Sequence, residues 1–144
     1  MKKGVLWLVL VTVSVGMVIV IRAHDQKPAA GPAFVGDWRK AQPNEGLTVV
    51  KISNQGNRWV VHVWGACTPR DCDWGEQPLA LLAIAPGSTT IDRGLAVWDH
   101  GFATSYVNFS VADGKLLGEI IEVYKDKSGR TNFHAVTRLV RSGF

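Results

Sequence analysis

Residues 61–75 read Val61-His62-Val63-Trp64-Gly65-Ala66-Cys67-Thr68-Pro69-Arg70-Asp71-Cys72-Asp73-Trp74-Gly75, the end of a predicted strand followed by a loop that a covalent bond can close. This stretch holds both cysteines of the chain at the spacing Cys-x4-Cys, and Pro69 restricts the backbone between them. Small exported domains commonly use disulfides to hold loops that their cores are too small to fix. The spacing therefore predicts a Cys67–Cys72 disulfide in an oxidising compartment.

Two other uses of these cysteines remain as alternatives. Zinc binding would need both sulfurs together with some of His62, His100 or Asp71, although no second Cys/His pair at zinc-finger spacing is present. A redox site would need Cys-x-x-Cys spacing and a helix start after the first cysteine, and neither is evident. If the two cysteines form a disulfide, the sequence predicts no metal site and no cofactor.

Short apolar runs alternate with turn-forming residues on both sides of this stretch. Upstream, residues 47–52 and 58–64 form a predicted hairpin around a turn at 53–57. Downstream, the predicted strands are 79–85, 94–98, 102–111, 116–124 and 131–141, and no helical stripe is present in this part. Successive hairpins leave exposed edges unless the sheet closes. The sequence therefore predicts an all-β fold, an antiparallel up-and-down barrel or half-barrel of seven or eight strands, with a two-sheet sandwich as the alternative.

The tripeptide Gly36-Asp37-Trp38 resembles the Gly-x-Trp that opens lipocalin-like and avidin-like barrels. The resemblance implies a calycin-type barrel in which Trp38 plugs the floor.

A longer resemblance covers nearly all of residues 34–144. It rests on residues 61–75, on Asp99-x-Gly101-Phe102-Ala103-Thr104 and on the closing hairpin at 126–130. These features are similar to an uncharacterised bacterial family of small exported domains. The resemblance implies bacterial origin, export and an all-β fold, and it assigns no catalytic residue.

The start of the chain is typical of a membrane segment. Residues 4–21 carry no charge and lie between Lys3 and Arg22. As a helix they would reach about 27 Å, enough to cross the hydrocarbon core, and a small-x-small cleavage site is missing. We expect residues 1–23 to form a transmembrane signal anchor, with a cleaved signal peptide and secretion as the alternative. Residues 24–33 are a predicted flexible linker to a single domain at 34–144.

The charge distribution bears on partners and location. The net charge is +4, but after Ala23 thirteen Lys and Arg stand against twelve Asp and Glu. The basic excess thus lies at the membrane flanks, and no basic stripe indicates nucleic-acid binding. A disulfide in the long C-terminal part places that part outside the cytoplasm, periplasmic or extracellular, on a bacterial cytoplasmic membrane.

Aromatic residues are the main candidates for a ligand site. Flat rings at the mouth of a barrel suit a sugar or an apolar ligand, although the same rings can serve as core packing. The candidates are Trp59, Trp64, Trp74, Trp98 and Tyr106. Strand alternation places Trp59 on one face with Val61, and Trp64 on the other with His62.

Polar residues give little indication of catalysis. An acid/base pair could be assembled from His62, His100 or His134 and nearby carboxylates, but no nucleophile or metal motif is present. Glu119 and Glu122 fall on opposite faces of one predicted strand and are interpreted as solvent or rim groups.

Together these patterns predict a membrane-anchored extracytoplasmic domain that binds a small molecule or glycan without transforming it. The stapled loop, with Trp64 and Trp74 at its base, would be the rigid recognition edge. The alternative is a structural or protein-interaction module of the bacterial cell envelope.

Overall fold

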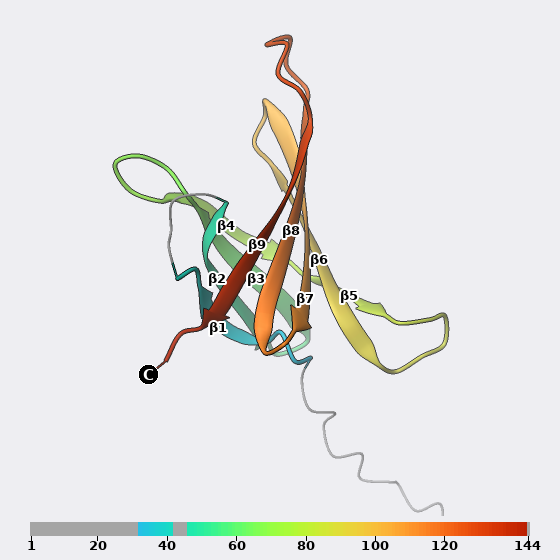
Figure 1. Ribbon diagram of the computed structural model, residues 1–144. Coiled ribbons are helices and arrows are strands. Elements are labelled where there is room, and N and C mark those ends of the chain that lie inside the picture. Colours follow the sequence, from blue (N-terminus) through green and yellow to red (C-terminus); the bar gives the residue numbers. More distant parts are fainter. Residues whose placement is uncertain (1–31, 42–45, 144) are drawn as a thin grey trace, which may run out of the picture.

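The computed structural model describes residues 32–41 and 46–143, which form one antiparallel sheet of nine strands (Figure 1). The strands are β1 (Gly36–Arg39), β2 (Leu47–Gln55), β3 (Arg58–Gly65), β4 (Cys72–Pro78), β5 (Ala80–Ala83), β6 (Ile91–Asp99), β7 (Ala103–Ala112), β8 (Lys115–Tyr124) and β9 (Phe133–Arg141). Their order in the sheet is β4-β3-β2-β1-β9-β8-β7-β6-β5. The predicted all-β antiparallel fold is confirmed.

Pairing between the first and last strands turns the sheet into a nearly closed barrel. Trp38 of β1 pairs with Arg141 of β9, and every other pair of strands joins neighbours in the chain. β4 and β5 are the two edges of the sheet and do not pair with each other. The indole nitrogen of Trp98 on β6 donates to the Gly75 carbonyl of β4 at 3.3 Å, which links the two sides of the remaining gap. A single sheet that curls in this way is a barrel, and the two-sheet sandwich is wrong.

The strand count differs from the predicted seven or eight because β4 was expected to be loop. Its sequence, CDWGEQP, shows no apolar alternation, so nothing in the side-chain pattern indicates a strand. Backbone pairing with β3 holds it instead, with a register shift beside Gly75, whose φ of +78° is favourable only for glycine. The next predicted strand, 79–85, is shorter in the structure and spans Ala80–Ala83.

One end of the barrel is filled around Trp38, which is buried and donates its indole N–H to the Phe34 carbonyl at 2.8 Å. The Arg141 guanidinium lies 4.3 Å from the ring centroid of Trp38 and donates to the carbonyls of Val35 and Ala33, each at 2.9 Å. A Cβ at Gly36 would lie 2.6 Å from an Arg141 nitrogen. The glycine of the Gly-x-Trp tripeptide thus lets the arginine reach across the strand.

The opposite end carries three connections. The β3–β4 loop, the β6–β7 turn and the β8–β9 hairpin project from the end away from the C-terminus (Figure 1). In the part of the chain that the structure describes, no helix is long and apolar enough to span a membrane. The predicted anchor at 1–23 and most of the linker at 24–33 lie outside the described residues.

Candidate functional site

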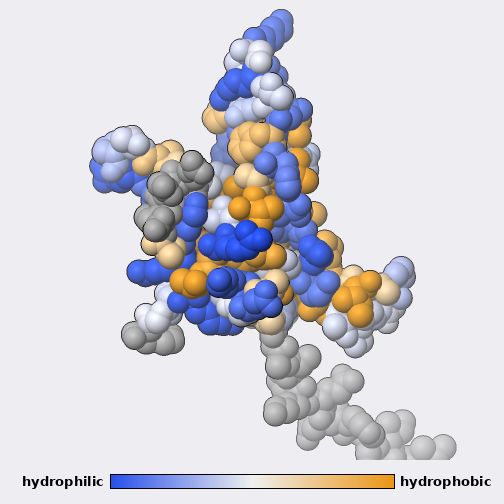
Figure 2. All heavy atoms as spheres, in the orientation of Figure 1, coloured by the Kyte–Doolittle hydropathy of each residue, from blue (hydrophilic) through white to orange (hydrophobic). Residues whose placement is uncertain are grey.

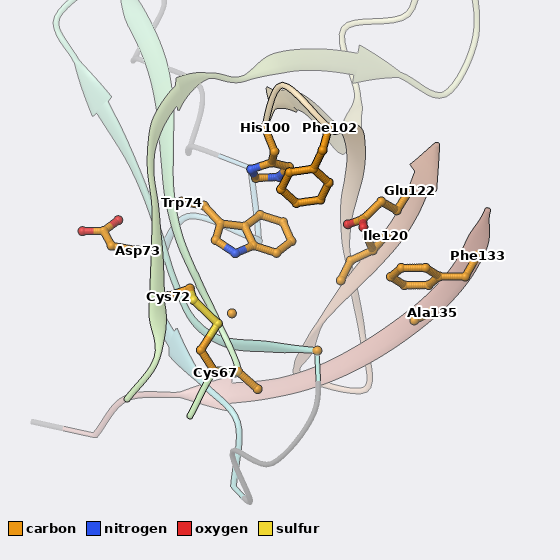
Figure 3. A pocket seen from close by; sticks show the side chains of 13 residues that line it. Cys67, Cys72, Asp73, Trp74, His100, Phe102, Ile120, Glu122, Phe133 and Ala135 are labelled. Atoms are coloured by element: carbon orange, nitrogen blue, oxygen red, sulfur yellow. A yellow bond between two sulfur atoms is a disulfide. The ribbon is translucent and has the colours of Figure 1, made fainter. Parts of the chain in front are cut away.

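A cavity of about 580 Å³ opens at the end of the barrel where β9 begins, away from Trp38. Figure 3 shows its side chains surrounding an open space, with contributions from β3, β4, β8 and β9 and from the β6–β7 turn. It is lined by Gly46, Gly65, Ala66, Cys67, Cys72, Asp73, Trp74, His100, Phe102, Ile120, Glu122, Phe133 and Ala135.

The hollow follows from the sizes of the inward-facing residues at successive levels of the barrel. Near the filled end, cross-strand partners include the large pair Leu116 and Leu139. Toward the cavity, the register brings Ile120 beside Ala135, and the next level joins Ser105 to Glu122. Small side chains here cannot fill the barrel cross-section, so space remains above the core.

Trp74 forms one wall of the cavity because the strand beside it has no side chain at the contact. A Cβ at Gly65 would lie 2.8 Å from the indole nitrogen and 3.0 and 3.1 Å from two indole carbons of Trp74. The first distance is shorter than real Cβ contacts and the other two are tighter than most of them, so the absence of a side chain at Gly65 lets the indole pack against β3. Trp74 is half-buried, and its ring meets that of Trp98 edge-on at 5.9 Å.

Aromatic rings continue around the rim from Trp74. The His100 ring lies edge-on to Trp74 at 5.1 Å, and Phe102 stacks on His100 at 5.9 Å. Tyr124 follows at 6.4 Å from Phe102, and Phe133 at 6.5 Å from Tyr124. The rim therefore presents a row of ring surfaces contributed by β4, the β6–β7 turn, β8 and β9.

A chain of hydrogen bonds ends at the Glu122 carboxylate. The buried hydroxyl of Ser105 donates to Glu122 Oε2 at 3.0 Å, and His100 Nε2 lies 3.1 Å from the Ser105 oxygen. Because the hydroxyl proton points to Glu122, we assign the proton of the second bond to His100 Nε2. A hydrogen bond to Glu122 raises the pKa of Tyr124 and so keeps that phenol protonated as a donor.

The Cys67–Cys72 disulfide is present and borders the cavity, with 5.5 Å between the two Cα atoms. It joins the β3–β4 loop to the first residue of β4. Since both sulfurs are bonded to each other, neither is available as a zinc thiolate. Among the described residues, no group of three or more His, Cys, Asp or Glu side chains is placed to hold a metal ion.

A second polar group lies outside the barrel wall. His62 stacks on Trp64 with centroids 3.8 Å apart, and its Nε2 lies 2.6 Å from Asp73 Oδ1. The hydrogen bond from His62 lowers the pKa of Asp73, and a second bond from the Gly75 amide acts in the same direction. Figure 3 shows the Asp73 carboxylate pointing away from the cavity. This group thus belongs to the outer surface.

The structure separates the five aromatic residues predicted as ligand contacts. Trp74 lines the cavity, and Trp98 lies behind it in the core with only 2% of its surface exposed. Trp59 packs against the core from the far end of β3, whereas Trp64 and Tyr106 lie on the outside of the barrel. The predicted alternation of Trp59 and Trp64 along β3 agrees with this placement.

Four cavity residues carry most of the site's chemistry and were not among the predicted contacts: His100, Phe102, Glu122 and Phe133. Glu122 was interpreted as a solvent or rim group, but it faces inward two residues after the buried Ile120. Side chains of a strand alternate between its two faces, so the position of Glu122 two residues after Ile120 could have predicted that it faces inward. Phe102 and Phe133 lie beside turns, where alternation gives no orientation.

Comparisons of the chain with protein-family models, with curated proteins and with solved structures find no match.

Proposed function

We propose that the domain binds a small organic molecule, or one residue of a glycan, in the cavity at the open end of the barrel. The observation that carries the proposal is a cavity of about 580 Å³ lined mainly by Trp74, Phe102 and Phe133, with few polar groups. Ligand sites in proteins are mostly apolar hollows of about 300–1,000 Å³ with a small number of polar anchors. Glu122 and His100 are the anchors here.

The domain is proposed to bind its ligand without transforming it. In a serine hydrolase the histidine accepts the serine proton, whereas here the Ser105 proton is directed to Glu122. The Ser105 side chain is also completely buried, so its oxygen is not accessible to a substrate carbonyl. The arrangement orients a carboxylate and does not activate a nucleophile.

The proposed location is outside the cytoplasm, on a membrane anchor formed by residues 1–23. The disulfide supports this location because thiols in the cytosol are kept reduced. Intact mass of the chain from native envelopes, with and without alkylation after reduction, checks both parts. Full-length mass with thiols that react only after reduction supports the proposal, and free thiols would contradict it.

Ligand binding is tested on the full chain in lipid nanodiscs by saturation-transfer NMR with a panel of water-soluble aromatic fragments and monosaccharides. Ala135→Phe fills the cavity from β9, and Trp64→Ala removes a ring from the outer surface. We expect at least one compound to bind the wild-type chain and the Trp64 variant and to lose binding in the Ala135 variant. The proposal fails if no compound distinguishes the wild-type chain from the filled variant.

A protein partner is the second candidate, favoured by an apolar row on the outer face of β6, β7 and β8. Val97, Tyr106 and Ile121 are cross-strand neighbours, and between 40% and 46% of each is exposed. On the face that Figure 2 presents, apolar and polar side chains are interspersed. Cross-linking in native envelopes tests this candidate, since Ile121→Lys would remove a cross-link made through this row and leave the cavity unchanged.

A further inference from the structure

We propose that the ligand carries a positive charge, as an alkylammonium or arylalkylammonium group, and that Glu122 binds this group among the aromatic rings. The inference rests on the proposed function and narrows the class of ligand.

The first observation is that the Glu122 carboxylate has no cationic partner among the described residues. Other acids near the open end are paired with a base: Lys125 Nζ binds Asp99, and Arg130 binds Asp126, each at 2.5 Å. Glu122 instead receives hydrogen bonds from the hydroxyls of Ser105 and Tyr124. Both donors are neutral, so they orient the carboxylate without forming an ion pair with it, and the nearest cation that the contacts identify, Arg130, bonds Tyr124 and not Glu122.

The second observation is that aromatic surfaces surround this carboxylate. Trp74, Phe102 and Phe133 line the same cavity as Glu122, and in Figure 3 their rings surround the space that it faces. Ring faces attract cations through their quadrupole. A carboxylate among rings is the combination that recognises an ammonium group, because the rings stabilise its charge while their surfaces match its alkyl substituents.

The rim already binds a cation in this way. The Arg130 guanidinium carbon lies 4.8 Å from the Phe102 centroid and 4.1 Å from the Tyr124 centroid. Arg130 also pairs with Asp126 and hydrogen-bonds the Tyr124 side chain, so this cation lies at the mouth of the cavity. Because Arg130 occupies a face of Phe102 and of Tyr124, a ligand cation would use chiefly the rings of Trp74 and Phe133, which line the same cavity.

Other ligand classes fit the cavity less well. An anion would meet the Glu122 carboxylate, and the basic side chains of the β8–β9 hairpin nearest to it are paired with Asp99 and Asp126. A neutral polyol needs several hydrogen-bonding groups, whereas the inward-facing polar side chains of the lining are those of His100 and Glu122. A cation satisfies the carboxylate directly.

The test compares two probes of nearly equal shape on the full chain in nanodiscs, choline and 3,3-dimethylbutan-1-ol, with binding followed by tryptophan fluorescence. We expect choline to bind about tenfold or more tightly than the neutral alcohol. Since this comparison uses the wild-type chain, it does not depend on the folding of any variant.

Benzyltrimethylammonium then probes the role of Glu122. Glu122→Gln is expected to weaken its binding about tenfold or more, whereas Glu119→Gln, on the outer face of the same strand, leaves the affinity unchanged. The inference is overturned if the alcohol binds as tightly as choline, or if the two variants bind benzyltrimethylammonium equally.

The outcome also separates this inference from the proposed function. If neutral probes bind as well as cations and Ala135→Phe removes both, the cavity binds ligands but not by charge. If neither choline nor the alcohol binds, the inference that the ligand is a cation fails. The proposed function is then tested separately by the saturation-transfer NMR screen of fragments and monosaccharides.

Discussion

Substituting Gly65 by alanine tests how Trp74 is positioned, because the new Cβ would lie 2.8 Å from the indole nitrogen. The indole must retreat by about 0.6 Å before it reaches 3.4 Å, where ordinary contact begins. Overpacking of this kind costs about 1–3 kcal/mol. The lower entropy of the unfolded alanine chain offsets about 0.4–1 kcal/mol. We expect a net loss of about 1–2 kcal/mol in the free energy of unfolding.

The assay is urea unfolding of the full chain, followed by tryptophan fluorescence and by circular dichroism. Gly143→Ala is the matched control, because a Cβ there meets nothing within 4 Å. The Gly65 variant should also show altered tryptophan emission and weaker binding of any cavity ligand, since Trp74 forms the cavity wall. A Gly65 variant with wild-type stability and unchanged emission would refute the argument that close packing on glycine positions this ring.

Three further predictions concern stability. Thr137→Val should lower the free energy of unfolding, measured by urea unfolding, by about 1–3 kcal/mol, because the buried Leu47 amide loses its hydrogen bond of 3.2 Å to the Thr137 hydroxyl. Thr137→Ser keeps a hydroxyl and should cost much less, so equal losses in the two variants would contradict this role. Reduction of the Cys67–Cys72 bond, which closes a short ring with a sequence separation of 5, should cost about 2 kcal/mol in the same assay, and an unchanged urea midpoint would argue against it. The hydrogen bond from Lys125 holds the pKa of Asp99 below its unfolded value of 3.8, so its contribution is complete above that pH and is lost as the pH falls further. Urea unfolding between pH 6 and pH 2 should therefore show a smaller acid loss for Asp99→Asn than for the wild-type chain, and identical slopes would exclude the effect.

The strands that could be predicted from the sequence are those in which side chains alternate or turns are explicit. The hairpin of β7 and β8 turns at Asp113 and Gly114, both with positive φ, and this is the two-residue signal that the sequence carries. β4 could not be predicted because backbone pairing with β3 holds it rather than a buried face. An edge strand of this kind leaves no trace in hydrophobic periodicity.

The site was harder to predict than the fold because it depends on which residues share a level of the barrel. Ser105 and Glu122 are 17 positions apart and become neighbours only through the register of β7 and β8. Trp64 and Trp74 look equivalent in sequence, since each borders the stapled loop. Their positions differ because Trp64 follows the outward alternation of β3, whereas Trp74 packs inward against Gly65.

The most direct test of the cavity is ¹⁹F NMR of the full chain labelled with 5-fluorotryptophan, titrated with benzyltrimethylammonium. The chain contains six tryptophans, and single Trp→Phe variants assign the resonances of Trp74, Trp64 and Trp59. We expect the Trp74 resonance to shift most and the resonances of Trp64 and Trp59 not to move. A shift at Trp64 with Trp74 unchanged, or no shift at any tryptophan, would contradict a cation site in the cavity.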